Sequence, residues 1–233
     1  MRSTTFLLTA MLLLVASFSI AADETKEKSD ELKRIEKAAG VLDELGGMSE
    51  GPPRSLLEKA AGVVVIPGLV KAGLGIGGKH GSGVLSIKGE DGAWSEPVFV
   101  KMTGGSIGFQ IGASSTDLVL LFMRETNIRD VLNGEFTLGG NASVAAGPVG
   151  RTGSADTSIK LDAEIYSYSR SRGAFAGISL DGSKLYVDKS ANALFYGESA
   201  TPETIVAMHA NAASPTAGFR ASLAALTTAA TKE

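Results

Sequence analysis

Apolar residues in the first part of the chain recur with the period of a helix. Within residues 23–46 they follow one another at three- and four-residue steps, and Gly46-Gly47 supplies a stop. The members of this stripe are Leu32, Ile35, Ala39, Leu42 and Leu45. The pattern predicts one long helix, and Pro52-Pro53 then favours a short helix that continues to Ala60.

From Gly62 onward the pattern changes to β-branched and alternating segments. Residues 62–67 form a β-branched run that we expect Pro67-Gly68 to end. Turn residues at 89–92 predict a hairpin between the strands 84–87 and 98–100, and Asp181-Gly182 predicts a second hairpin over 179–185. The other strands are expected at 106–111, 118–123, 136–145, 159–168 and 174–180.

Helical signals return at three places. Residues 125–132 predict a short helix that stops at Asn133-Gly134, and Thr201-Pro202-Glu203 begins another. The Ala/Thr-rich residues 212–233 favour a loose final helix that frays. The sequence therefore predicts one α+β domain, with an antiparallel-rich, curved or barrel-like β core and N- and C-terminal helices packed on it.

The first 21 residues resemble a cleavable signal peptide. Arg2 precedes an apolar run, and Ser19-Ile20-Ala21 has a small-x-small cleavage pattern. We expect a signal peptide at 1–21, one domain at 22–211 and a C-terminal tail at 212–233. The expected location is periplasmic or secreted, and the absence of cysteine excludes a lipoprotein anchor and disulfides.

Charge narrows the range of partners. The chain has 22 Lys and Arg residues against 25 Asp and Glu residues, a net charge of −3. A nucleic-acid partner would require a basic face, so we expect none. Neither His80 nor His209 has carboxylates at the spacing of a metal site, and we expect no metal and no cofactor.

Two glycine-rich motifs resemble sites of known chemistry. Residues 73–80 nearly match a phosphate-binding loop, but a strand follows where that loop requires a helix N-terminus, which favours a bulged glycine-rich strand. Residues 104–108 match the nucleophile pattern G-x-S-x-G around Ser106, with His209 further along the chain. Strand-like alternation follows Ser106 instead of a helix, so a serine hydrolase is the weaker hypothesis, and we expect no enzyme.

A sparse set of cations in glycine-rich or turn segments remains. Exposed backbone N–H groups and a nearby cation can hold a phosphate without a catalytic residue. For any one of these charges taken alone, ordinary solvated surface is the favoured interpretation. The candidate head-group ligands are Lys71, Lys79, His80, Arg151, Arg170 and Arg172. A set of amphipathic aromatic rings could line a lipid-facing surface: Trp94, Tyr166, Tyr168, Phe175 and Tyr196. For Tyr166 and Tyr168, which share one face of a strand, core packing is favoured.

An ordered series of motifs resembles the SYLF domain, a lipid-binding domain of bacterial exported proteins and of eukaryotic membrane-traffic and actin-associated proteins. The likeness extends over about residues 30–210 and includes the segments 62–67, 73–83, 94–97, 105–108, 147–151, 166–170, 173–177 and 195–197. The resemblance implies phospholipid binding without enzyme activity or cofactor.

One feature of some SYLF relatives is weak in this chain. Their N-terminal basic amphipathic helix contributes to membrane contact, whereas acidic residues outnumber the basic ones here between Ala22 and Leu45. The sequence predicts a phospholipid or membrane-surface partner at the cell envelope. An envelope structural or protein-interaction module without lipid dependence remains the alternative, with the Ser106 hydrolase third.

Overall fold

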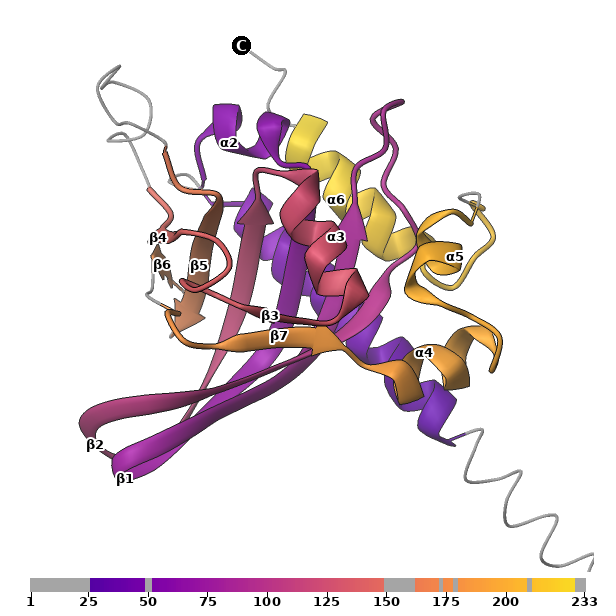
Figure 1. Cartoon of the computed structure of the whole chain (residues 1–233). Coiled ribbons are helices and arrows are strands. Elements are labelled where there is room, and N and C mark those ends of the chain that lie inside the picture. The colour runs from indigo at the N-terminus through magenta and orange to yellow at the C-terminus, as the bar shows by residue number, and fades with distance from the viewer. Residues whose placement is uncertain are drawn as a thin grey trace, which may run out of the picture.

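The computed structural model describes residues 26–48, 52–148, 162–171, 174–177, 180–208 and 211–228. The signal peptide predicted at 1–21 lies outside these residues. A mixed seven-stranded sheet curls into a half-barrel, with helices on its outside and one helix against its inside (Figure 1). The α+β class and the curved β core are confirmed.

The N-terminal helix extends over residues 26–46. The helices that follow are α2 (Arg54–Lys59), α3 (Glu125–Asn133), α4 (Lys189–Tyr196), α5 (Pro202–Val206) and α6 (Ala217–Thr228). The strands are β1 (Gly62–Ile87), β2 (Val98–Phe122), β3 (Glu135–Thr137), β4 (Val144–Ala146), β5 (Ile165–Ser171), β6 (Ala174–Gly177) and β7 (Lys184–Val187).

Two very long strands build most of the sheet. β1 and β2 pair antiparallel from Gly62 with Phe122 to Leu85 with Val98, and their middle parts extend away from the body as a ribbon (Figure 1). The prediction that Pro67-Gly68 ends the first strand was wrong. The register shifts there instead, and Asp117 accepts a hydrogen bond from the Gly68 N–H, where φ is +64°, so the strand continues through a bulge.

The half-barrel closes because β1 folds back on itself. A Cβ atom at Gly83 would lie 2.0 Å from the Val65 carbonyl oxygen, and one at Gly81 would lie 2.6 Å from the Ile66 side chain. The two halves of β1 therefore touch backbone to backbone, which only glycine permits at Gly83. β2 bends with its partner, so one end of β2 pairs with β7 and the other with β5.

The Asp181-Gly182 hairpin was also predicted wrongly. A tight turn forms, with the Ser183 N–H donating to the Leu180 carbonyl. The strands on either side do not pair with each other within the described residues, since β6 pairs with β5 and β7 pairs with β2 and β3. The turn thus moves the chain from one part of the sheet to another.

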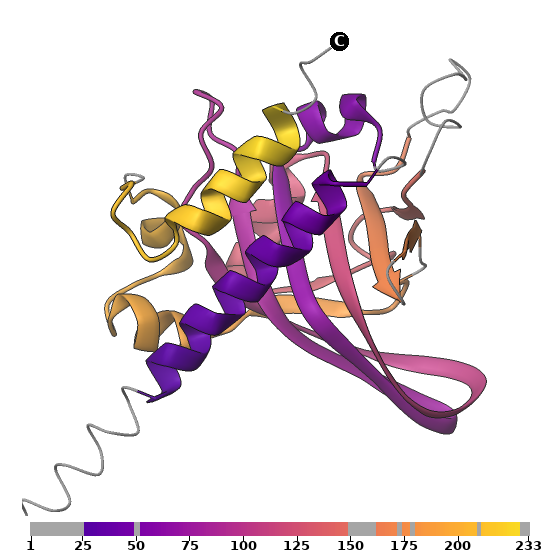
Figure 2. The same ribbon diagram turned by 180° about the vertical axis from the view of Figure 1, so that it is seen from behind.

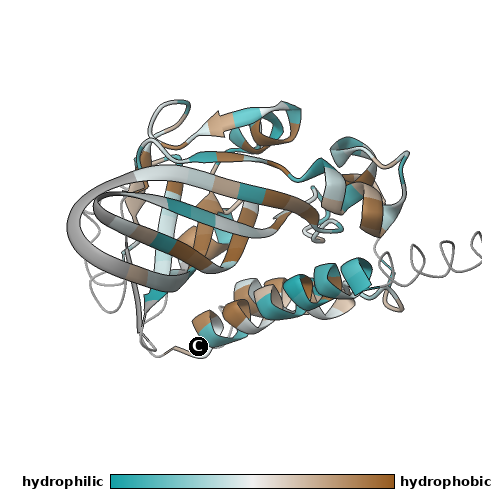
Figure 3. Cartoon of the chain, turned by 90° about the horizontal axis from the view of Figure 1, so that it is seen from below, coloured by the Kyte–Doolittle hydropathy of each residue, from teal (hydrophilic) through white to brown (hydrophobic). Residues whose placement is uncertain are grey.

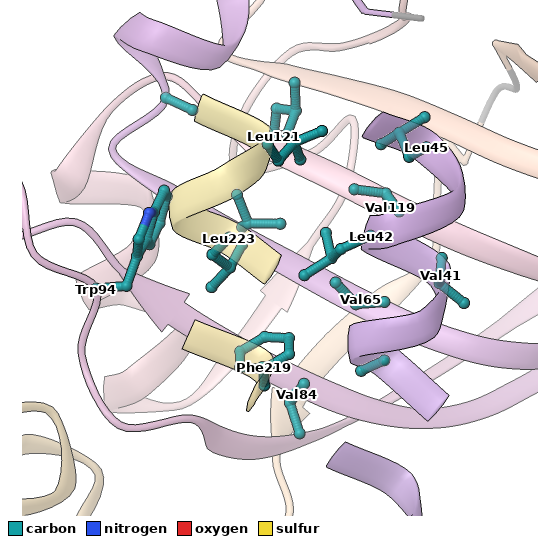
Figure 4. Packing of buried hydrophobic residues seen from close by; sticks show 14 of the residues in the cluster. Val41, Leu42, Leu45, Val65, Val84, Trp94, Val119, Leu121, Phe219 and Leu223 are labelled. Carbon is teal, nitrogen blue, oxygen red and sulfur yellow. The ribbon is translucent and has the colours of Figure 1, made fainter. Parts of the chain in front are cut away.

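Alternate side chains of the strands enter two separate cores. The outer core lies between the sheet and the pair formed by the N-terminal helix and α6, which lie side by side in Figure 2. Val41, Leu42 and Leu45 of the first helix meet Phe219 and Leu223 of α6 over the strands (Figure 4). The final helix, expected to be loose, is packed into this core.

The inner core lies inside the curl and is closed by α3. Ile128 and Val131 of α3 pack with Leu85, Met102 and other strand residues that are fully buried. Figure 3 shows apolar positions alternating with polar ones along the curled strands. Beyond the inner core, polar residues of β1 continue the same inner face to the point where the ribbon leaves the body.

Candidate functional site: the mouth of the half-barrel

Two predicted site residues lie on the inner face where the ribbon leaves the body. Lys79 pairs with Gly104 and lies two residues before Gly81, whose partner Met102 belongs to the inner core. Lys71 lies two residues after Leu69, another inner-core residue. Because strand side chains alternate, both lysines are on the inner face. We call this region, with Gly104, Asp181 and Ser183, the mouth.

Lys79 is packed closely against the turn that precedes β7. A Cβ atom at Gly104 would lie 2.8 Å from Lys79 Cε and 3.1 Å from Ser183 Oγ, so both side chains share the space above this glycine. Lys79 is 9% exposed and Ser183 is fully buried. The Ser183 hydroxyl has no hydrogen-bond partner within the described residues.

The electrostatics of the mouth are unusual for a buried cation. Burial and the neighbouring Lys71 ammonium lower the pKa of Lys79 below its usual value, and Asp181 opposes this shift. Among the residues that the structure describes, Lys79 forms no hydrogen bond or ion pair. A buried charge is costly unless it is paired.

Other cations of limited exposure are neutralised. Arg34 and Lys101 lie 3.4 and 3.0 Å from the Asp188 carboxylate. Arg220 lies 3.3 Å from Glu96, which also accepts a hydrogen bond from Thr216. These ion pairs explain how the fold tolerates cations of limited exposure. Lys79 has no such ion pair among the described residues.

Of the remaining predicted ligands, the two that the structure describes, His80 and Arg170, do not join Lys71 and Lys79 at the mouth. His80 is exposed and points to the opposite, outer face of β1, as Thr103 does on β2. Arg170 forms ion pairs with Glu44 of the first helix and with Asp117 at the bulge, which gives it a role in the fold. Arg151 and Arg172 lie outside the described residues. Contact of any of the six with a head group stays a prediction.

The aromatic residues are mostly structural. Trp94, Tyr166 and Tyr168 are buried in the outer core, as favoured for the two tyrosines. The Tyr196 hydroxyl donates to the Pro97 carbonyl at 2.7 Å, and burial raises the pKa of Tyr196. The side chain of Phe175 lies outside the described part of the chain.

The outer groove lies between the first helix and the chain around β7 and α4. This groove, of about 2100 Å³, is lined by the first helix, β7, α4 and the chain around α5. Asp188 forms its buried polar floor, caps α4 at the Ala191 N–H and pairs with Arg34 and Lys101. Glu198 and Glu203 stand on its rim.

The two enzyme-like motifs adopt strand structure. The glycines 73–83 belong to β1, with a register shift at Leu74/Gly75, so the bulged-strand interpretation is confirmed. Ser106 lies within β2 opposite Gly77, whereas a nucleophile elbow requires a turn from strand to helix. His209 lies outside the described residues.

Sequence reasoning missed Ser183 and Gly104 as parts of the mouth. Ser183 looked like an ordinary turn residue, and Gly104 looked like part of the nucleophile motif. Gly104 lies beside Lys79 because β1 pairs with β2, and Ser183 reaches the same place because β7 pairs with β2.

Comparison with known proteins agrees with the motif series. The family model "Ysc84: Las17-binding protein actin regulator" matches residues 103–229. Protein YSC84 of Saccharomyces cerevisiae is 36% identical over 186 residues, which cover 78% of this chain and 39% of that protein. The SH3 domain-containing YSC84-like protein 1 of Xenopus laevis is 40% identical over 169 residues, covering 70% of this chain and 50% of that protein.

The chain therefore spans half or less of the length of these relatives, but most of its own length is matched. The match extends from β2 at the mouth to the end of α6, which includes the turn with Ser183. On this evidence the chain belongs to the Ysc84/SYLF domain family.

Proposed function

We propose that this protein binds phospholipid at the cell envelope without catalysing a reaction, through the mouth of the half-barrel. The Ysc84/SYLF domain is a binding module related to lipid and actin, and its family is generally non-catalytic. For an exported chain, as residues 1–21 lead us to expect, a lipid surface is the more accessible of these two partners.

The observation that supports lipid best is the unpaired Lys79. Its neighbours are the uncharged Ser183 and a second lysine, Lys71. The other cations of limited exposure are paired with carboxylates: Arg34, Lys101, Arg170 and Arg220. An anionic group that enters the mouth would supply the missing partner.

Liposome flotation tests this proposal. Protein lacking residues 1–21 is mixed with liposomes of phosphatidylethanolamine alone or with phosphatidylglycerol or cardiolipin. We expect it to float with the anionic liposomes, and to do so less as salt is raised. Failure to float with any of the three compositions would discard lipid binding.

The second candidate is a protein-interaction module that uses the outer groove. Its size and the acidic rim at Glu198 and Glu203 favour a basic segment of a partner. Capture of an envelope protein that persists without lipid and is lost in the double variant Glu198→Gln/Glu203→Gln would favour this candidate.

No helix in the described residues is long and apolar enough to cross a membrane. A hydrolase at Ser106 is the third candidate, and an absence of labelling of Ser106 by a fluorophosphonate probe would remove it.

A further inference from the structure

We propose that the mouth is a built site for one phosphodiester group, with Lys79 and Ser183 as its direct ligands and Lys71 as a second cation. This inference rests on the proposed function and narrows it to a place on the molecule and a class of head group.

The first argument is the hydroxyl. Ser183 is fully buried, and its Oγ has no hydrogen-bond partner among the described residues. Its backbone N–H and carbonyl are already used, in bonds to Leu180 and Leu138. A buried polar group without a partner costs free energy, so a donor kept in this state indicates a ligand that is held only part of the time.

The second argument is the geometry above Gly104. Lys79 Cε and Ser183 Oγ lie 2.8 and 3.1 Å from the position that a Cβ atom would occupy there. The Lys79 ammonium is one bond beyond this Cε, so an ammonium and a hydroxyl held this near to each other can donate to two oxygens of a single tetrahedral anion. Gly104 allows the two side chains to approach each other this closely, because any larger residue there would displace the lysine or press on Ser183.

The third argument is the charge balance. Lys71 acts on Lys79 as a like charge, and Asp181 acts on it as an opposite charge. Two ammonium groups and one carboxylate leave one net positive charge at the mouth. A ligand with one negative charge would bring the net charge of the mouth to zero. This favours the monoanion of a phosphodiester over a multiply charged phosphate monoester.

Two sources can supply a phosphodiester: a glycerophospholipid head group in a membrane, or a free diester in solution. A lipid such as phosphatidylglycerol presents the diester without a cation beside it. In phosphatidylcholine the choline cation would be repelled by the two lysines.

The experiment compares vesicle binding by wild type, Lys79→Met, Ser183→Ala and the control Lys59→Met. Met retains the apolar stem of Lys79 and removes the ammonium, and Lys59 lies on α2, at the far end of the body from the ribbon (Figure 1). Vesicles are phosphatidylcholine alone or phosphatidylcholine with about 30% phosphatidylglycerol.

We expect Lys79→Met to weaken binding roughly 10- to 100-fold, as for loss of a hydrogen bond to a charged group. Ser183→Ala should weaken it about fivefold, and Lys59→Met by less than about twofold. If wild type binds and both mouth variants bind equally well, the site is wrong while lipid binding stands. If wild type does not bind, the proposed function itself fails.

A soluble arm separates the two sources. Glycerophosphoglycerol, which has the same diester without acyl chains, is titrated while the amide NMR signal of Ser183 is followed. A shift that is lost in Lys79→Met supports the site. Binding of the soluble diester without binding to vesicles assigns the site to free diesters and overturns lipid as the ligand. No shift and no vesicle difference overturns the inference.

Discussion

Two cations of this molecule occupy opposite kinds of environment. Arg220 of α6 is held by Glu96, which Thr216 also supports, beneath the loop that joins β1 and β2. Lys79 is also largely buried, yet no carboxylate of the described residues is paired with it. The contrast teaches that the first charge fixes α6 to the loop between β1 and β2, whereas the second has no such partner and is the one that we propose for a ligand.

This difference follows from the cost of burying charge. For a paired charge, attraction to its countercharge offsets part of the free-energy cost of desolvation within the protein. For an unpaired charge, that cost is offset only when a ligand of opposite charge binds. Loss of the pair should therefore damage the fold, and loss of the unpaired charge should damage only binding.

The largest effect is expected at the paired site. Glu96→Gln leaves the Arg220 guanidinium buried without a countercharge, and we expect a loss of about 3 kcal/mol in the free energy of unfolding. Urea denaturation followed by circular dichroism measures it. Glu90→Gln, on the exposed turn of the same loop, is the control and should change stability by less than about 0.5 kcal/mol. Equal effects of the two substitutions would show that the pair does not anchor α6.

Closure of the half-barrel is the next largest effect. Gly83→Ala forces a Cβ atom to within 2.0 Å of the Val65 carbonyl, and we expect a loss of about 2 kcal/mol. The same denaturation experiment measures it. Gly78→Ala is a matched control on β1, since its nearest neighbour would be the Gly104 oxygen at 3.9 Å. A stable Gly83→Ala variant would mean that the two halves of β1 need not touch.

Lys79→Met should stabilise the protein by about 0.5–2 kcal/mol at neutral pH while it weakens binding. The folded-state pKa of Lys79 is lowered, so the unfolded chain binds this proton more tightly. Wild-type stability should therefore rise with pH from the lowered pKa of Lys79 toward its ordinary value, and the advantage of the variant should shrink over that window. Denaturation midpoints of both proteins across this alkaline range measure it. A variant less stable than wild type would contradict an unpaired charge.

The smallest effect is expected at His80. Its side chain is exposed on the outer face, so His80→Ala should change vesicle binding by less than about twofold at neutral pH. Flotation with the phosphatidylglycerol mixture measures it beside Lys79→Met. A loss at His80 as large as that at Lys79 would place the lipid contact on the outer face of the sheet.

Much of the fold could be predicted from local patterns. The first helix, α3 and the capped start of α5 are all present, because each has its own period or cap. The 89–92 turn joins β1 to β2 as expected, with Gly92 at a φ of +80°. The short α4 was not predicted, since its Asp188 cap also takes part in the distant pairs with Arg34 and Lys101.

The sequence by itself determined the class of the fold, the β character of the glycine-rich region and the family. These depend on residue types and on spacing along the chain. Only the tertiary structure decided that Lys79 and Ser183 share one space while Arg170 pairs with Glu44 and His80 faces outward. The physical reason is that β1 continues through its bulge and folds back on itself, and no local pattern specifies which distant strands a curled strand will meet.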